Sequence, residues 1–290
     1  MSGCVRGARA HDRPLLALAS LSGEADAAWA RQADDLADLA FLGGLALDAE
    51  SREAARKLVA RDRTEFLPDD PLAFAEQQLS ALADRPIRAG VNVRSATPGP
   101  IQEAARICAD HDAVLEINAH CRQPELRAVG CGESLLADTD RLAEYVECAA
   151  ATGATVSVKV RAEVPGVDLR ETTRAVAEAG ADAVHVDAMD SESVIRDVVT
   201  AAQSVADGGS SLTEDPGNRV AVIANNEVRD RESVHEYLRY GADGVSVGRP
   251  STDRRVVRRV REALVAWEEG DREQSAGADG RPHEDAEVSP

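Results

Sequence analysis

The chain contains almost no lysine and few aromatic residues. Only two of its 33 basic residues are lysines, Lys57 and Lys159, and the others are arginines. Aromatic residues make up 3% of the sequence, whereas hydrophobic residues of all types make up 43%. The core must therefore be built mainly from alanine, valine and leucine. Lys159, in the stretch ATVSVKVRAE, interrupts an alternating apolar pattern that is typical of a β-strand.

The sequence also lacks a long apolar run and a paired-cysteine motif. No run reaches the roughly 18 apolar residues that predict a membrane-spanning helix, and the N-terminal MSGCVRGARAHDRP has no apolar core of a signal peptide. The chain has five cysteines, an odd number, and no two of them form a C-x-x-C motif. They predict reduced thiols in a cytoplasmic protein without membrane contact, rather than a disulfide framework or a metal site.

Positive charge is scarce as well. The chain carries 52 acidic residues against 33 basic ones, for a formal net charge of −19. Such an excess opposes non-specific binding to nucleic acids, because phosphate groups are repelled. Abundant acids with scarce lysine also suit a cytoplasm of very high salt, where screening removes self-repulsion. We therefore expect a halophilic archaeal source, and the charge indicates the solvent more than the partner.

Short apolar runs alternate with amphipathic helical patterns along the chain. Their alternation predicts an α/β protein, a (β/α)₈ TIM barrel over residues 14–267, because eight strands separated by helices favour a closed parallel barrel. No G-x-G-x-x-G follows the first run, which argues against a dinucleotide-binding sheet. The predicted strands are 14–20, 38–44, 87–93, 113–118, 155–160, 183–187, 220–225 and 244–248.

Four segments depart from this alternation. Residues 45–86 are long for one connection and predict extra helices or a loop over the barrel mouth. Residues 204–219 form a polar insertion rich in glycine and serine. We expect a flexible N-terminus over residues 1–13 and a disordered acidic tail over residues 268–290, since both contain few apolar residues.

Polar residues stand at or just beyond the ends of most predicted strands. In a parallel barrel these ends converge on one mouth, where functional groups gather. Taken singly, each such residue is more often a structural cap; taken together, they predict a site. They are Ser20, Asn92, Asn118, Lys159, His185, Asn225, Asn226, Gly248 and Arg249.

Several of these segments resemble one protein family in the same order along the chain. INAHCRQPELRAVGCGESLL (117–136) resembles the Asn…Gly-Cys-Pro block of the dihydrouridine synthases, and TVSVKVR resembles their fifth strand. VIANNEV, GADGVSVGRP and GVNVRSATP resemble the ends of their seventh, eighth and third strands. Dihydroorotate dehydrogenases share this type of flavin-binding barrel. The resemblance implies an FMN-linked oxidoreductase, with NADPH as the reductant and a pyrimidine, in tRNA or free, as the substrate.

The resemblance also implies roles for individual residues. Lys159 would contact the flavin, where a compact ammonium suits a crowded, negatively charged edge better than a planar guanidinium does. Cys121 would be the general acid that protonates C5 of a uracil ring while reduced flavin supplies hydride to C6, and Cys131 is its rival. Asn118 and Arg122 would contact the substrate. The implied cofactor contacts are Ser20, Asn92, Lys159, His185, Asn225, Asn226, Gly248 and Arg249.

The sequence departs from the family pattern at several points. His120-Cys121-Arg122 replaces Gly-Cys-Pro, and Val186-Asp187 replaces the Gly-Arg that follows the histidine in many synthases. Only residues 249–290 follow Gly248, so we expect the usual C-terminal helical tRNA-binding domain to be missing. The arginine-rich segment 253–267 carries an apolar stripe and predicts the last barrel helix. An enzyme acting on a free pyrimidine and a flavin-binding barrel without turnover remain as alternatives, and the oligomeric state is open.

Overall fold

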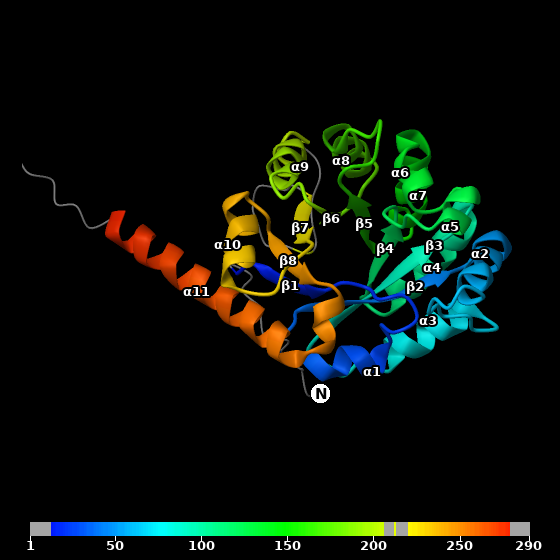
Figure 1. The fold of residues 1–290 in the computed structure, drawn as a ribbon, viewed down its shortest axis with the longest axis horizontal. Helices are drawn as coiled ribbons and strands as arrows, with labels where there is room; N and C mark the ends of the chain where they lie inside the picture. Colours follow the sequence, from blue (N-terminus) through cyan, green and yellow to red (C-terminus); the bar gives the residue numbers. More distant parts are fainter. Residues whose placement is uncertain (1–12, 206–211, 213–219, 279–290) are drawn as a thin grey trace, which may run out of the picture.

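The computed structural model describes residues 13–205, 212 and 220–278 of the 290-residue chain. Parallel strands β1 to β8 pair in chain order and close into a barrel, since β1 pairs with both β2 and β8. Figure 1 shows helices around this barrel. The predicted (β/α)₈ fold is confirmed. The strands are β1 (Leu15–Leu18), β2 (Leu39–Ala46), β3 (Arg88–Arg94), β4 (Val114–Asn118), β5 (Thr155–Arg161), β6 (Ala183–Asp187), β7 (Ala221–Asn225) and β8 (Gly244–Val247).

The long connection after β2 contains two helices, α2 and α3, as the sequence predicts. Aspartates precede many of the helices as N-cap residues. The side chains of Asp48, Asp70, Asp168 and Asp230 accept hydrogen bonds from backbone N–H groups of the first turn, which would otherwise have no partner within the helix. The helices are α1 (Ala27–Ala30), η1 (Arg31–Ala33), α2 (Ala49–Val59), α3 (Pro71–Ser80), α4 (Pro98–Asp110), α5 (Pro124–Ala128), α6 (Glu133–Leu136), α7 (Thr139–Ala150), α8 (Leu169–Glu178), α9 (Val194–Gln203), α10 (Arg231–Arg239), η2 (Arg249–Thr252) and α11 (Arg254–Ala278).

Alternation along the strands separates two kinds of core. Outward-facing valines, leucines and isoleucines pack against the helices in one large cluster. Inward-facing residues divide by height along the barrel axis. Near the N-terminal ends of the strands they are apolar: Ala17, Leu39, Phe41, Val114, Ala183, Ala221 and Ile223. Towards the C-terminal ends they are polar and still buried: Asn92, Arg94, Glu116, Asn118, Ser157, Lys159, Arg161, His185, Asn225 and Ser246.

Helix α11 is longer than the sequence predicts. It continues to Ala278, beyond the predicted helix end at residue 267 and into the segment 268–290 that was predicted to be a disordered tail. The glutamate, glutamine and arginine that follow Gly270 favour helix, and extending an existing helix is easier than starting one. The last turns extend past α10 in Figure 1. Residues 1–12, 206–211, 213–219 and 279–290 lie outside the described residues, so most of the polar insertion does as well.

The arginine-rich segment forms the last barrel helix, as predicted, and two of its arginines bond to other parts of the chain. Arg254 donates to the Gln32 carbonyl and to Asp35, and Arg261 donates to Asp38 at 2.6 Å. The apolar stripe Val257, Val260 and Leu264 is fully buried. No helix within the described ranges is long and apolar enough to cross a membrane.

Closure of the barrel depends on the small size of Gly244 in β8. A Cβ atom added there would lie 2.5 Å from the Leu15 carbonyl oxygen and 2.6 Å from the Leu15 Cβ. We expect Gly244→Ala to lower the free energy of unfolding by about 1–3 kcal/mol in urea titrations. Gly99→Ala is the control, because a Cβ there meets nothing within 4 Å, and its effect should stay within about 1 kcal/mol. Equal unfolding midpoints for the two variants would contradict this.

Candidate functional site

A chain of hydrogen bonds crosses the interior of the barrel below its C-terminal mouth. Its centre is Glu116 of β4, which has no exposed surface. Its Oε1 accepts the Asn92 amide at 2.7 Å, its Oε2 lies 2.6 Å from His185 Nδ1, and the Ser157 hydroxyl lies 3.5 Å away. A buried carboxylate with this many partners is firmly held. Glu116 is not among the site residues predicted from the sequence.

The chain of bonds continues from His185 to β7 and β8. His185 Nε2 lies 2.6 Å from the Ser246 hydroxyl, and the Asn225 amide donates to the same hydroxyl at 2.7 Å. The His185 ring also stacks on Phe41, with ring centroids 5.3 Å apart. His185 therefore has no exposed surface and both of its nitrogens are bonded within the barrel. A direct flavin contact by His185, as the resemblance implies, would require one of these bonds to be given up.

The protonation pattern follows from burial and neighbouring charges. Burial raises the pKa of Glu116, but His185, Lys159 and the Asn92 amide outweigh burial and hold that pKa below its ordinary value. Burial and the Lys159 charge lower the pKa of His185. Glu116 is therefore an anion and His185 a neutral imidazole. This assigns the proton to His185 Nδ1, which donates to Glu116, while Nε2 accepts from Ser246.

The same chain of bonds reaches the loop that carries Cys121. The Asn118 amide donates to Asn92 Oδ1 at 2.8 Å, and Asn118 Oδ1 accepts the backbone N–H of Cys121 at 3.2 Å. On the other side of the loop, the backbone N–H of Glu133 donates to the Cys121 carbonyl at 3.0 Å. Asn118 and Asn92 therefore bind other protein groups, and Asn92 has no exposed surface. Both hold the site in place from within the barrel.

Gly132 packs directly against the Cys121 loop. Its φ is +61°, and an added Cβ would lie 2.1 Å from the Cys121 carbonyl oxygen. At Gly132 ψ is −130°, a combination that glycine alone adopts readily. Gly153 also has a positive φ, +81°, but a Cβ there meets nothing within 4 Å. Gly153→Ala should lose about 1–3 kcal/mol of stability from its positive φ alone. Gly132→Ala should lose more, because its Cβ also meets the Cys121 carbonyl oxygen. Only Gly132→Ala should also change the rate of Cys121 alkylation by iodoacetamide, measured by mass spectrometry; equal rates in both variants would contradict the contact.

The two cysteines considered for the acid differ in accessibility. Cys121 is half-buried, and it packs against a small apolar cluster that contains Leu58, Leu126 and Cys131. Cys131 is 1% exposed, and burial raises the pKa of its thiol to about 12. A sealed thiol cannot reach a bound ring, so the geometry favours Cys121. Cys108 is buried in α4, and burial raises the pKa of its thiol to about 12 as well, which fits a packing residue.

Lys159 is the cation at the centre of the mouth. It lies inward on β5, and its side chain is only 3% exposed. Its ammonium makes no hydrogen bond to any other residue that the structure describes, although Glu116 and Asp187 lie close enough to act on its charge. Burial lowers the pKa of Lys159, and the two acids oppose this shift only in part. A buried ammonium without a partner can donate hydrogen bonds to an anionic or carbonyl ligand.

The turns after β7 and β8 present backbone donors. Asn226 has φ +107°, and its side chain donates to the Met189 carbonyl at 2.6 Å, which ties this turn to the loop after β6. Across the parts of the chain that the structure describes, the backbone N–H groups of Asn226, Gly248 and Arg249 have no acceptor. Such clustered free N–H groups bind phosphate. The residues at these two turns fit a phosphate group.

Two arginines and a histidine at the mouth were not selected from the sequence. Arg94 ends β3 and forms a buried ion pair with Glu65 at 2.7 Å, and Arg161 ends β5 and pairs with Glu133 at 2.8 Å. Burial, together with Lys159, Arg94 and other nearby cations, holds the pKa of His120 well below its ordinary value. His120 is therefore neutral. The sequence does contain a signal for the two arginines. Arg94 and Arg161 stand two residues after Asn92 and Lys159, so they lie on the same face of their strands.

The remaining predicted residues lie at the rim. Ser20 follows β1 and is half-buried, whereas Arg122 and Arg249 are exposed. Arg122 makes no hydrogen bond or ion pair to another residue in the described part of the chain. The structure thus gathers the interior residues into one bonded group and leaves these three around it.

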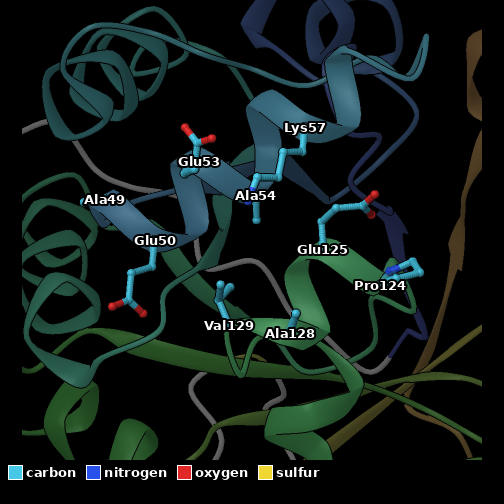
Figure 2. A pocket seen from close by; sticks show the side chains of 9 residues that line it. All are labelled: Ala49, Glu50, Glu53, Ala54, Lys57, Pro124, Glu125, Ala128 and Val129. Atoms are coloured by element: carbon cyan, nitrogen blue, oxygen red, sulfur yellow. The ribbon is translucent and has the colours of Figure 1, made fainter.

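A surface cleft of about 550 Å³ lies outside the barrel, between α2 and α5. Figure 2 shows acidic side chains at its edge, together with Lys57. None of the predicted site residues lines this cleft. Its walls are Ala49, Glu50, Glu53, Ala54, Lys57, Pro124, Glu125, Ala128 and Val129.

These features define a TIM barrel with an enzyme-type site, because its charged and amide side chains collect at the C-terminal ends of the strands. A model of the dihydrouridine synthase (Dus) family matches residues 52–278. The chain therefore belongs to the dihydrouridine synthase family, whose enzymes depend on FMN.

Two further proteins are similar to this chain. MJ0144, an uncharacterized protein of Methanocaldococcus jannaschii, is 26% identical over 235 residues, which are 80% of this chain and 87% of that protein. The crystal structure of an IMP dehydrogenase/GMP reductase-like protein from Corynebacterium glutamicum is similar, with a TM-score of 0.52 and 17% identity. The match covers 84% of this chain and 66% of that one, and at this identity it shows the fold alone.

Proposed function

We propose that the protein is an FMN-dependent oxidoreductase of the dihydrouridine-synthase type that reduces the C5=C6 bond of a uracil ring. The observation that carries this proposal is the unbonded, buried ammonium of Lys159 at the mouth of a barrel that belongs to the family. When bound and reduced, FMN would supply the hydride for C6 of the ring. NADPH is the proposed source of the electrons.

The residues of the mouth fit the parts of FMN. The free N–H groups of Asn226, Gly248 and Arg249 suit the phosphate. The Lys159 ammonium suits the flavin edge that becomes negative on reduction. Gly248 leaves open space beside these donors, because a Cβ there would meet only the Asn225 amide nitrogen, at 4.0 Å. Asn225 and Ser20 border the same region, while Asn92 and His185 support it from inside the barrel.

Cys121 is the proposed acid for C5. A thiol on the loop after β4 can donate a proton to the ring while hydride arrives at C6, so the two additions together complete the reduction. The loop is held at the Cys121 N–H by Asn118 and at the Cys121 carbonyl by Glu133. Arg122, exposed and unpaired within the described residues, is the proposed contact to substrate at the rim.

The experiment that tests the substrate is tRNA analysis. Total tRNA from a strain that lacks the gene should contain less dihydrouridine than wild-type tRNA, and the purified protein with FMN and NADPH should restore it. Unchanged dihydrouridine in the deletion strain, together with NADPH oxidation that depends on a free pyrimidine, would contradict the tRNA substrate and keep the flavin chemistry.

A further inference from the structure

Glu116 occupies a position that the proposed chemistry does not use directly. It is fully buried on β4 and touches neither the mouth nor the surface. Yet its two oxygens bond the Asn92 amide and the His185 ring, whose further partners are Asn118 and Ser246. One carboxylate therefore joins the Cys121 loop on one side to the β7–β8 side of the barrel on the other.

The negative charge of Glu116 also acts on Lys159. Glu116 pairs in register with Ser157, and Asn118 with Lys159, so Glu116 and Lys159 are inward-facing diagonal neighbours on β4 and β5. A buried ammonium without an anion nearby gives up its proton, because burial penalises the charged form. The other titratable or charged groups near Lys159 are His120 after β4, Arg161 on β5, and His185 and Asp187 on β6. Of these, only Asp187 is an anion.

We propose that Glu116 is the positioning residue of the site: its negative charge keeps Lys159 protonated inside the barrel, and its two oxygens fix the orientations of Asn92 and His185. Glu116 acts on bound ligand through these three side chains. The consequences for flavin rest on the proposed function; the protonation of Lys159 does not.

The protonation of Lys159 can be measured directly, because the chain contains only one other lysine. Protein labelled with ¹³C,¹⁵N-lysine gives signals from Lys57 and Lys159 alone, and Lys57, exposed on α2, is an internal reference. In Glu116→Gln, which keeps the shape of the side chain and removes its charge, the titration midpoint of Lys159 should fall by about 1–3 pH units. The Lys57 signal should not move. Glu53→Gln, which removes an exposed acid on α2, is the matched control and should leave the Lys159 signal unchanged.

The variant Glu116→Asp separates the effect of the negative charge from the effect of the side-chain length. It keeps the negative charge but is one methylene shorter, so the Lys159 midpoint should stay near the wild-type value. The His185 tautomer, followed by ¹⁵N shifts of the ring, should become mixed because the bond to Nδ1 is lost. Should Glu116→Gln fail to fold, Lys159→Met/Glu116→Gln provides the test. Since it removes both charges, it should unfold at a higher urea concentration than Lys159→Met, whose Glu116 is left without its cation.

The flavin-loaded protein supplies a separate readout. In Glu116→Gln, reduction of FMN by NADPH should be lost as pH rises through the lowered Lys159 midpoint, because the lysine is charged only below it. Above that midpoint the rate should fall about tenfold for each further pH unit, and it should recover at lower pH. An identical Lys159 titration in wild type and Glu116→Gln would overturn the inference. A failure to bind FMN with the Lys159 shift intact would instead overturn the proposed function alone.

Discussion

Replacing Cys121 by alanine is expected to lower the rate of uracil-ring reduction by about 10²–10⁴-fold, the usual contribution of a positioned proton donor. The substitution removes the thiol but keeps the backbone N–H that Asn118 holds and the carbonyl that Glu133 holds. FMN binding and the reduction of FMN by NADPH should therefore be unchanged. Single-turnover oxidation of the reduced flavin by substrate measures the step directly.

The control for this experiment is Cys148→Ala. Cys148 is half-buried on α7 and is not among the site residues. It should react at the wild-type rate. A Cys121→Ala protein that also reduces substrate at the wild-type rate would remove Cys121 from the acid role. A loss of FMN reduction together with substrate reduction would show that the loop had moved.

Replacing Lys159 by arginine is expected to slow flavin reduction by about 10–100-fold, equivalent to the roughly 1.5–3 kcal/mol of one charge-assisted hydrogen bond. Arginine keeps the positive charge that balances Glu116, so the protein should still fold. The guanidinium is larger and planar, and it directs its donors in a fixed fork. Its charge stays near Glu116, but it cannot place its donors where the enclosed ammonium of Lys159, a residue that is 3% exposed, places its own. Stopped-flow measurement of FMN bleaching by NADPH gives the rate.

Lys57→Arg is the matched control, since it makes the same change at the only other lysine. Lys57 is exposed on α2, outside the barrel mouth. It should have no effect on flavin reduction. Wild-type reduction rates in Lys159→Arg would show that the position requires only a positive charge, and the proposed flavin contact would then be wrong.

The strands could be predicted from the sequence because their signal is local. Each strand is a short run in which apolar residues alternate with others or follow one another, as in TVSVKV and AVHVD. The observed bounds of the eight strands differ from the predicted ones by no more than two residues. The order of the strands follows from the same alternation with helices. Helix α11 was predicted too short because low apolar content was taken as disorder, although its residues also favour helix.

The site could be predicted only in part. Strand parity places Asn92 and His185 inside the barrel, but their depth below the mouth depends on the stagger between strands, which a single sequence does not reveal. Both were predicted to contact the flavin, and both lie fully buried in side-chain hydrogen bonds. Glu116 was not predicted because it lies within a strand, whereas the predicted site residues stand at or just beyond strand ends. Its signal was present: a charged residue within the apolar run VLEIN, on the same face as Asn118.

The visible absorbance spectrum of the purified protein, incubated with FMN and freed of unbound ligand, tests the central claim most directly. A family barrel with an unbonded Lys159 ammonium and free N–H groups at the β7 and β8 turns should retain FMN and show its yellow absorption band, and NADPH should bleach that band. A colourless protein after this treatment would contradict the account, because every proposed role at the mouth depends on bound flavin.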